Sequence, residues 1–285
     1  MIDQAESLRR KMKGRRKQAR TIAIVSGKGG VGKSVISLNF AITLARHGKK
    51  VLVFDLDIGM GNIEFLAGMT TDLSIVDFFT HQYHLKDIIT PGPCGIAIIS
   101  GGSGLNEMVH LDRERIDFFI RQLHELLYEY DYILFDIGAG MDDERVHLLS
   151  AIDHIFVVVT PEITSIMDAY SAIKLIVQRM PHVNLHLIGN RMKNARENEE
   201  VLSRITKTMQ RFLQYRGEIA GFIPEDRFIQ QAVKQQIPFI LYRPHSPGAR
   251  KMQSLVENFL QKVGEGRTKK PASLLEKLQA YLLKR

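Results

Sequence analysis

One glycine-rich stretch, residues 26–34 (SGKGGVGKS), constrains the fold of this chain more than any other part of the sequence. It fits the phosphate-loop pattern of a glycine, four residues, a second glycine, a lysine and a hydroxyl residue. An apolar run over residues 21–25 precedes it, and a helical pattern over residues 34–46 follows it. The pattern therefore lies between a predicted strand and a predicted helix, as a nucleotide-binding loop requires. A glycine-rich turn that carries a lysine by chance is the alternative.

The residue types in this loop are those that hold a nucleoside triphosphate with Mg²⁺. Glycines let the backbone curl so that successive N–H groups point at phosphate oxygens, beside the positive end of the following helix. Lys33 is predicted to reach the β- and γ-phosphates, and Ser34 is predicted to ligate Mg²⁺. The predicted nucleotide-binding residues of the loop are Gly29, Gly30, Val31, Gly32, Lys33 and Ser34.

A second lysine, Lys28, lies inside the loop at a position where an ordinary phosphate loop requires no charge. With this lysine the loop resembles the deviant Walker A loop of the MinD/ParA family of ATPases. In that family the extra lysine reaches across a nucleotide-sandwiched dimer to the phosphates of the partner. The resemblance, rather than the spacing, implies the same catalytic role for Lys28 and a homodimer that forms with ATP.

The formal charge of +8 over 285 residues is concentrated at the two ends of the chain. Residues 1–20 carry +6 and residues 265–285 carry +4, which leaves −2 for the body between them. The basic balance therefore describes two tails rather than a nucleic-acid-binding surface. The single cysteine, Cys94, excludes an intrachain disulfide and any metal or iron–sulfur site built on paired cysteines. No run approaches 18 apolar residues, so we expect a cytosolic protein that does not span a membrane.

Two apolar runs end in acidic residues. Residues 50–57 have the pattern of a buried strand ending in Asp55 and Asp57, and residues 131–136 have the pattern of a strand ending in Asp136. Because open α/β sheets bind ligands at the carboxyl ends of their strands, we expect these carboxylates near the phosphates and Mg²⁺. Helix capping or solvation in a loop is the alternative for the first pair.

The same stretches resemble the second and third motifs of the MinD/ParA family. There the second aspartate of the first pair positions the attacking water, so the resemblance implies that Asp57 is catalytic and that Asp55 lies close to the metal. Asp136 matches the Walker B aspartate, which holds Mg²⁺ through water.

Two further strand ends are candidates for contacts with the base. The strand predicted over residues 183–189 runs into an Asn-Arg pair, and the strand predicted over residues 218–223 runs into Pro-Glu-Asp. In related ATPases an asparagine at the first of these positions reads the adenine edge, whereas an ordinary turn is the alternative for the pair. The base-side residues that the resemblance implies are Asn190, Arg191, Pro224 and Asp226.

Residues 1–20 are too charged and too poor in apolar residues to fold on their own. A solvated tail or a basic arm on DNA fits this composition. However, the stretch Asp-Gln-Ala-x-x-Leu-Arg over residues 3–9 resembles the N-terminal motif of the FlhG family (also called FleN or YlxH), the MinD-like regulators of flagellar number. In that family the segment activates the GTPase FlhF by placing a glutamine near its active site. The partner-binding residues that the resemblance implies are Asp3, Gln4, Ala5, Leu8 and Arg9.

Residues 264–272 are predicted to form a linker, and residues 273–285 an amphipathic helix. The apolar face of that helix is formed by Leu274, Leu275, Leu278, Tyr281 and Leu282. A basic linker followed by such a helix fits binding to an anionic membrane surface, while a final helix docked on the domain is the alternative. MinD and FlhG both end in a membrane-targeting helix, so the resemblance implies the same role here.

The alternation of strands and helices predicts a single α/β domain over residues 21–263, with a doubly wound, mostly parallel sheet and helices on both faces. The resemblance covers nearly the whole chain and implies a MinD-like P-loop NTPase of the FlhG type. Such an ATPase binds ATP or ADP with Mg²⁺, dimerises with ATP, cycles between the cytosol and the inner face of the cell membrane, and regulates flagellum number with FlhF and flagellar C-ring proteins as partners. A division-site (MinD) ATPase, a ParA-type DNA-partitioning ATPase and a module that uses ATP only as a clamp are the alternatives. DNA is not an expected partner.

Overall fold

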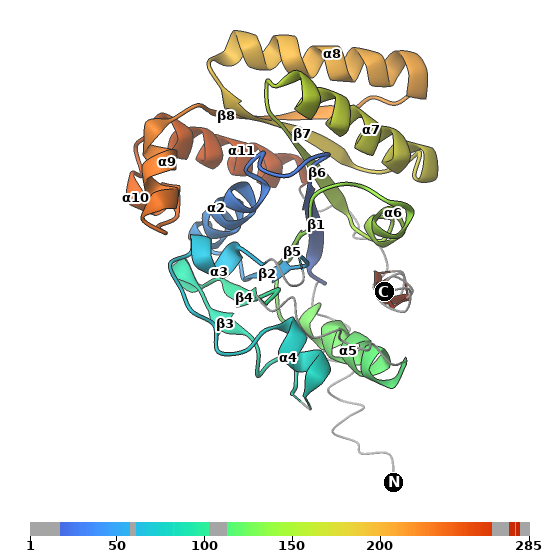
Figure 1. The fold of residues 1–285 in the computed structure, drawn as a ribbon, viewed down its shortest axis with the longest axis vertical. Helices are drawn as coiled ribbons and strands as arrows, with labels where there is room; N and C mark the ends of the chain where they lie inside the picture. Colours follow the sequence, from blue (N-terminus) through green and yellow to red (C-terminus); the bar gives the residue numbers. More distant parts are fainter. Residues whose placement is uncertain are drawn as a thin grey trace.

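A central sheet with helices on both faces organises the protein, as the computed structural model shows (Figure 1). The structure describes residues 18–57, 61–81, 83–102, 113–263, 274–276 and 278–279. The motif predicted over residues 3–9 and the linker over 264–272 lie outside these residues. The strands of the described part are β1 (Arg20–Val25), β2 (Val51–Asp55), β3 (Thr90–Pro91), β4 (Ala97–Ile99), β5 (Tyr132–Asp136), β6 (His154–Val159), β7 (Leu185–Met192) and β8 (Glu218–Pro224).

The strands lie in the order β3-β4-β2-β5-β1-β6-β7-β8. Every neighbouring pair is parallel except β3 with β4, which is a short antiparallel edge. The prediction of a mostly parallel, doubly wound sheet is confirmed. Because β1 lies between β5 and β6, the loop that leaves β1 is at the centre of the carboxyl edge, where such sheets bind ligands.

Helices cover both faces of this sheet (Figure 1). The helices of the described part are α2 (Lys33–Arg46), α3 (Ile63–Leu66), α4 (Ile75–Thr80), α5 (Arg113–Leu126), α6 (Asp143–Leu149), α7 (Ile163–Arg179), α8 (Ala195–Leu213), α9 (Arg227–Lys234), α10 (Phe239–Tyr242), α11 (Pro247–Val263) and a 3₁₀ turn, η1 (Pro93–Gly95). Residues of α4 to α8 pack on one face and residues of α2, α3 and α9 to α11 pack on the other.

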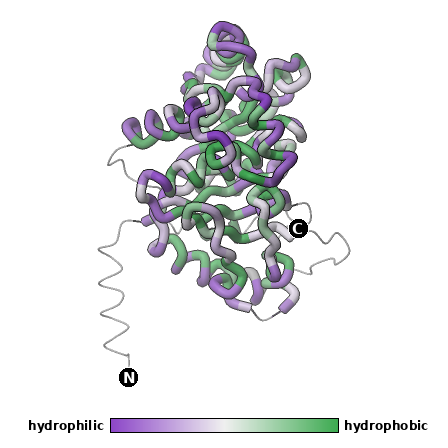
Figure 2. Tube along the Cα trace, turned by 90° about the vertical axis from the view of Figure 1, so that its left-hand side faces the viewer, coloured by the Kyte–Doolittle hydropathy of each residue, from purple (hydrophilic) through white to green (hydrophobic). Residues whose placement is uncertain are grey.

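Two hydrophobic cores result, one on each face, because successive side chains of a strand point to opposite faces. In β1, Ala23 and Val25 belong to the core under α5, and Ile22 and Ile24 belong to the core under α2. We call these the α5-side core and the α2-side core. Figure 2 shows hydrophobic segments running through the middle of the molecule, while the outer helices alternate between hydrophobic and hydrophilic turns. Burial on both faces explains why the strands are continuous apolar runs.

The strand predicted to end at residue 189 continues to Met192. It pairs with β8 as far as Pro224, with a shift of register between Asn190 and Met192. Asn190 and Arg191 therefore lie within a strand rather than in a turn after it. The sequence pattern missed this extension because both residues are polar, whereas a buried strand is recognised by its apolar residues.

The C-terminal residues that the structure describes pack on the domain instead of standing free. Leu274, Leu275 and Leu278 are only 2%, 8% and 0% exposed, and they belong to the α5-side core. The Gln279 side chain donates a hydrogen bond to the Asp117 carboxylate of α5, and the segment lies near α5 in Figure 1. In this structure the three leucines are docked, because packing in the α5-side core removes them from water as a membrane would. Tyr281 and Leu282 lie outside the described residues.

Phe54→Ala should destabilise the domain by about 3–5 kcal/mol, because it leaves a cavity in the α5-side core. The Phe54 ring is fully buried, with its centroid 5.9 Å from the rings of Phe119 and Phe135. Phe65→Ala is the matched control, because the Phe65 side chain is 58% exposed and its loss should change stability by less than about 0.5 kcal/mol. Urea unfolding measures both variants, and equal losses would contradict the assignment of the core.

Candidate nucleotide-binding site

The glycine-rich loop over residues 26–34, called the phosphate loop below, leaves β1 at the carboxyl edge and leads into α2. Gly32 precedes the helix with φ +87°, a left-handed conformation that favours glycine. Gly27 is required for a different reason, since a Cβ there would lie 2.2 Å from the carbonyl carbon of Asp168 in α7. The loop is thus fitted between β1 and α7, and its backbone N–H groups at the start of α2 are available for phosphate oxygens.

Lys33 and Asp136 form a buried ion pair at the centre of the site. Lys33 Nζ lies 2.9 Å from Asp136 Oδ1, and the two side chains are 7% and 1% exposed. The Ser37 hydroxyl donates a hydrogen bond of 2.7 Å to the same oxygen, and Lys33 Nζ also lies 3.3 Å from Ser34 Oγ. Among the described residues the second oxygen, Oδ2, is buried without a hydrogen-bond partner. A buried carboxylate oxygen with an open position beside a serine hydroxyl fits the oxygen-rich surroundings of Mg²⁺.

Asp55 lies beside Asp136 in the register of β2 and β5. Its carboxylate accepts hydrogen bonds from the backbone N–H groups of Asp57, Asn62 and Ile63, so it shapes the loop that follows β2. Burial, followed by the negative charge of Asp136, raises the pKa of Asp55 to about 7. Two adjacent buried carboxylates favour a nearby cation, and this is consistent with the predicted position of Asp55 close to a metal.

Asp57 reaches across to the chain that follows β5. A Cβ on Gly138 would lie 2.9 Å from Asp57 Oδ1, so only glycine leaves room for this carboxylate. The next residue, Ala139, lies near the phosphate loop, because its Cβ is 3.8 Å from the point that a Cβ on Gly29 would occupy. The structure therefore brings Asp57 to the same edge as Lys33 and Asp136, as the sequence predicted.

Lys28 is turned away from the Lys33–Asp136 pair and towards the start of α7. Its Nζ donates hydrogen bonds of 2.9 Å to Glu162 Oε2 and 2.9 Å to Thr164 Oγ1. The hydrogen bond from Lys28 to Glu162, together with the positive charge of the lysine, lowers the pKa of Glu162 below its usual range. The pair is exposed, so it is a weak contact that other interactions can replace.

Two residues that make contacts in the site, Glu162 and Ser37, were not predicted from the sequence. Glu162 follows the carboxyl end of β6, so the strand-end rule that selected the other acids would also have selected it. Ser37 lies one turn after Ser34 in α2, and helical spacing places it on the same side of the helix.

The asparagine and arginine in β7 hold the phosphate loop directly. Asn190 Nδ2 donates to the Val31 carbonyl oxygen (2.7 Å), and Arg191 donates to the Gly30 carbonyl oxygen (3.0 Å). These bonds place both residues against the predicted nucleotide site, and their contact with a base stays a prediction.

Asp226 joins the loop after β8 to α9 and α11 through two hydrogen bonds. Its Oδ1 accepts from the Phe228 N–H at the start of α9, and its Oδ2 accepts from the Gly248 N–H of α11. Pro224, at the end of β8, pairs with Met192. The structure therefore explains how this loop is fixed, and the predicted base contacts of Pro224 and Asp226 stay predictions.

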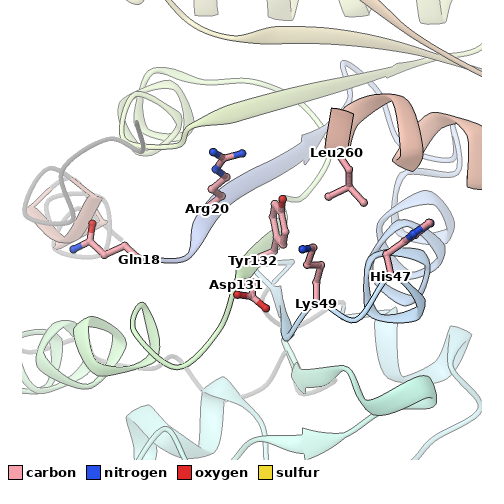
Figure 3. Close-up of a pocket in the computed structure, with 7 residues that line it drawn as sticks. All are labelled: Gln18, Arg20, His47, Lys49, Asp131, Tyr132 and Leu260. Atoms are coloured by element: carbon pink, nitrogen blue, oxygen red, sulfur yellow. The ribbon is translucent and has the colours of Figure 1, made fainter. Parts of the chain in front are cut away.

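A separate cavity of about 450 Å³ lies at the opposite edge of the sheet. Figure 3 shows that its walls come from the start of β1, the turn after α2, the start of β5 and α11. Its lining residues are Gln18, Arg20, His47, Lys49, Asp131, Tyr132 and Leu260. Because the phosphate loop is at the other end of β1, this cavity is not part of the nucleotide site.

Comparison with known proteins agrees with this geometry. A model of the ParA family, described as an NUBPL iron-transfer P-loop NTPase, matches residues 17–260. The chain belongs to the ParA/MinD family of P-loop NTPases. Within this family it is 33% identical to the antiactivator FleN of Pseudomonas aeruginosa, over 75% of this chain and 77% of FleN. It is also 36% identical to the flagellum site-determining protein YlxH of Helicobacter pylori, over 65% of this chain and 63% of YlxH.

The fold is that of solved members of the ParA/MinD family. The septum site-determining protein MinD from Pyrococcus horikoshii, solved with Mg-ADP, gives a TM-score of 0.70 at 24% identity and covers 86% of this chain and 98% of that chain. The resemblance to FlhG, FleN and YlxH that the loop and the N-terminal motif predicted is confirmed, and so is the P-loop fold.

Asp55→Asn should make the stability of this ParA/MinD-family domain less dependent on pH. Because the folded-state pKa of Asp55 is about 7 against an ordinary 3.8, the folded state holds this proton more tightly than the unfolded state does. The contribution of Asp55 to stability is therefore complete below pH 3.8 and is lost as the pH rises towards 7, because the unfolded state loses the proton first. The stability of the variant relative to wild type should therefore increase from about pH 4 to about pH 7. Urea unfolding in EDTA measures this difference, and a difference that is constant across this range would contradict the assignment.

Proposed function

We propose that this protein is an ATPase of the FlhG type, which dimerises with ATP, binds the cell membrane reversibly and regulates the number and placement of flagella. The similarity to FleN, over three quarters of each chain, is the observation that carries the flagellar part of this proposal. Stimulation of an FlhF-type GTPase through the N-terminal segment, and contact with flagellar C-ring proteins, are its proposed outputs.

Hydrolysis is assigned to residues that position ATP and neutralise its charge, since phosphoryl transfer needs little covalent chemistry from the protein. The phosphate loop and Lys33 hold the phosphates, and Asp57 orients the attacking water. Ser34 and the free oxygen of Asp136 would hold Mg²⁺, which supplies positive charge to the phosphates when bound. The buried Lys33–Asp136 pair supports this assignment, because it places the lysine at the end of the loop before any ligand arrives.

Dimerisation is assigned to the surface that carries Lys28. Its ammonium is directed away from its own Lys33–Asp136 pair and is held by exposed partners, Glu162 and Thr164, at the start of α7. A lysine held in this way can exchange these partners for the phosphates of a second subunit at small cost, because an exposed pair contributes little. Beside it Ile163 and Met167 are 75% and 65% exposed, one helical turn apart, and they would be covered in a dimer.

Membrane binding requires the C-terminal residues to leave the groove in which they are docked. Burying three leucines gives each about 1.5–3 kcal/mol, while ordering the segment costs ~1–2 kcal/mol per residue. These terms oppose each other, so we expect docking through only three leucines to be weak and reversible. Within the described residues, no helix combines the length and the apolar character that crossing a bilayer needs. Two released tails on one dimer could raise avidity for a surface by about 10²–10⁴.

The N-terminal segment leaves the domain at the end of α5. The Gln18 side chain donates to the Tyr128 hydroxyl (2.7 Å), and the Ala19 N–H donates to the Leu127 carbonyl (2.7 Å). These bonds fix the residues that directly follow the proposed partner-binding segment, on the side of the α5-side core.

Gln4→Ala in the full chain should weaken stimulation of an FlhF-type GTPase, because the resemblance assigns this glutamine to the partner's active site. Gln18→Ala is the matched control, since Gln18 lies outside the motif and contacts Tyr128. GTP turnover by the partner is measured with each variant in excess. Equal stimulation by both variants would exclude the Gln4 role. If deletion of residues 1–17 removed only DNA binding, the partitioning alternative would be favoured.

Wild-type protein should sediment with anionic vesicles more strongly in ATP than in ADP, because only the dimer presents two tails. Lys28→Ala should remove this difference, and Leu278→Glu should reduce binding with both nucleotides. Leu283→Glu is the matched control, because helical periodicity places Leu283 outside the apolar face. Equal sedimentation of wild type in ATP and ADP would show that nucleotide does not control the tail.

A further inference from the structure

The guanidinium of Arg145 lies beside Gly138 and Gly140, in the segment over residues 137–142 that joins Asp136 to α6. Its Nη2 is 3.7 Å from the Cβ position of Gly138, and its Nη1 is 3.8 Å from that of Gly140. Asp57 Oδ1 approaches the Gly138 position from nearby, at 2.9 Å. The guanidinium of Arg145 and the carboxylate of Asp57 therefore both lie close to Gly138, and Ala139 of the same segment lies near the phosphate loop.

Asp142 directs the arginine into this position. Its Oδ1 accepts the Arg145 N–H (2.8 Å) and caps α6, while its Oδ2 pairs with Arg145 Nη1 (3.0 Å). The arginine side chain is 23% exposed whereas that of Asp142 is 54% exposed, so the guanidinium is turned towards the glycine segment and its partner towards water. One aspartate thus starts the helix and fixes the arginine.

A surface ion pair alone does not account for this arrangement. Arg145 is in the first turn of α6, where the helix dipole favours acids and disfavours a cation. An exposed pair three residues apart in sequence contributes little to stability. What the arrangement does provide is a positive charge near the carboxylate proposed to orient water, with both groups close to Gly138 in a segment that lies near the phosphate loop.

We propose that Arg145 is a positioning residue for hydrolysis: its guanidinium holds the Gly138–Gly140 segment and the Asp57 carboxylate in the arrangement that the attacking water requires. This inference rests on the proposed ATPase function. It concerns the chemical step rather than ATP binding, because the residues assigned to the phosphates are Lys33 and the loop. A displacement of Asp57 by about 1 Å would lower the rate roughly 100-fold.

The test compares Arg145→Ala with Arg145→Lys and with the control Arg179→Ala. Arg179 also pairs with an aspartate of α6, Asp143 at 2.8 Å, but it belongs to α7 and is exposed. Steady-state ATPase assays with Mg²⁺ and anionic vesicles give kcat and KM, and thermal unfolding reports folding. Binding of ADP with aluminium fluoride, and of a non-hydrolysable ATP analogue, separates affinity for the transition state from affinity for the ground state.

Arg145→Ala should lower kcat about 10- to 100-fold with little change in KM. It should weaken binding of ADP–aluminium fluoride by a similar factor and leave binding of the ATP analogue unchanged. Arg145→Lys should restore part of kcat, and Arg179→Ala should match wild type. An unchanged kcat in Arg145→Ala would overturn the inference. So would a loss of affinity for the ATP analogue as large as the loss for ADP–aluminium fluoride, accompanied by a loss of thermal stability. Failure of the wild-type protein to hydrolyse ATP would overturn the proposed function itself.

Discussion

The buried ion pair between Lys33 and Asp136 is the interaction on which the rest of the site depends. It joins the phosphate loop to β5, and the Ser37 hydroxyl adds a second bond to the same carboxylate oxygen. Breaking such a pair from one side is costly, because it leaves an uncompensated buried charge. The pair therefore keeps the lysine and the acidic strand end together at the centre of the carboxyl edge, and the other strand ends are placed around it by the parallel register of the sheet. Asp55 adds a second buried carboxylate, so the site favours a cation even though a lysine already occupies it.

The phosphate loop around this pair is held by hydrogen bonds from β7 on one side and by exposed contacts of Lys28 on another. Asn190 and Arg191 of β7 bond to carbonyl oxygens of the loop, so its conformation is supported by a strand far away in sequence. Lys28, by contrast, is held by an exposed glutamate and threonine at the start of α7. A rigid loop that carries one weakly held cation is suited to a site that is complete only when a second subunit supplies or receives that cation. This arrangement fits the proposed division between residues that would bind nucleotide within one subunit and a lysine that would act between two.

The first and last parts of the chain that the structure describes both contact α5 or the residues directly after it. Gln18 and Ala19 bond to Tyr128 and Leu127, and the described part of the tail packs into the α5-side core with Gln279 bonded to Asp117. The same core also includes residues of α6 and α7, which begin near the nucleotide edge of the sheet. Few apolar contacts hold a segment weakly, so the docking of three leucines is compatible with the proposed release of the tail.

Local features could be predicted from the residues alone: the strand, loop and helix around residues 26–34, the acids at the ends of β2 and β5, and the alternation that gives a parallel sheet. These features follow from short spacings, which neighbouring residues set without help from the rest of the chain. Tertiary structure alone decided which groups meet over long separations, such as Lys28 with Glu162 and Arg145 with the glycine segment beside Asp57. It also placed the described leucines of the tail. Periodicity shows that Leu274 and Leu278 share one face of a helix, but a membrane and the domain both remove that face from water, so only the packed structure shows these leucines in the α5-side core.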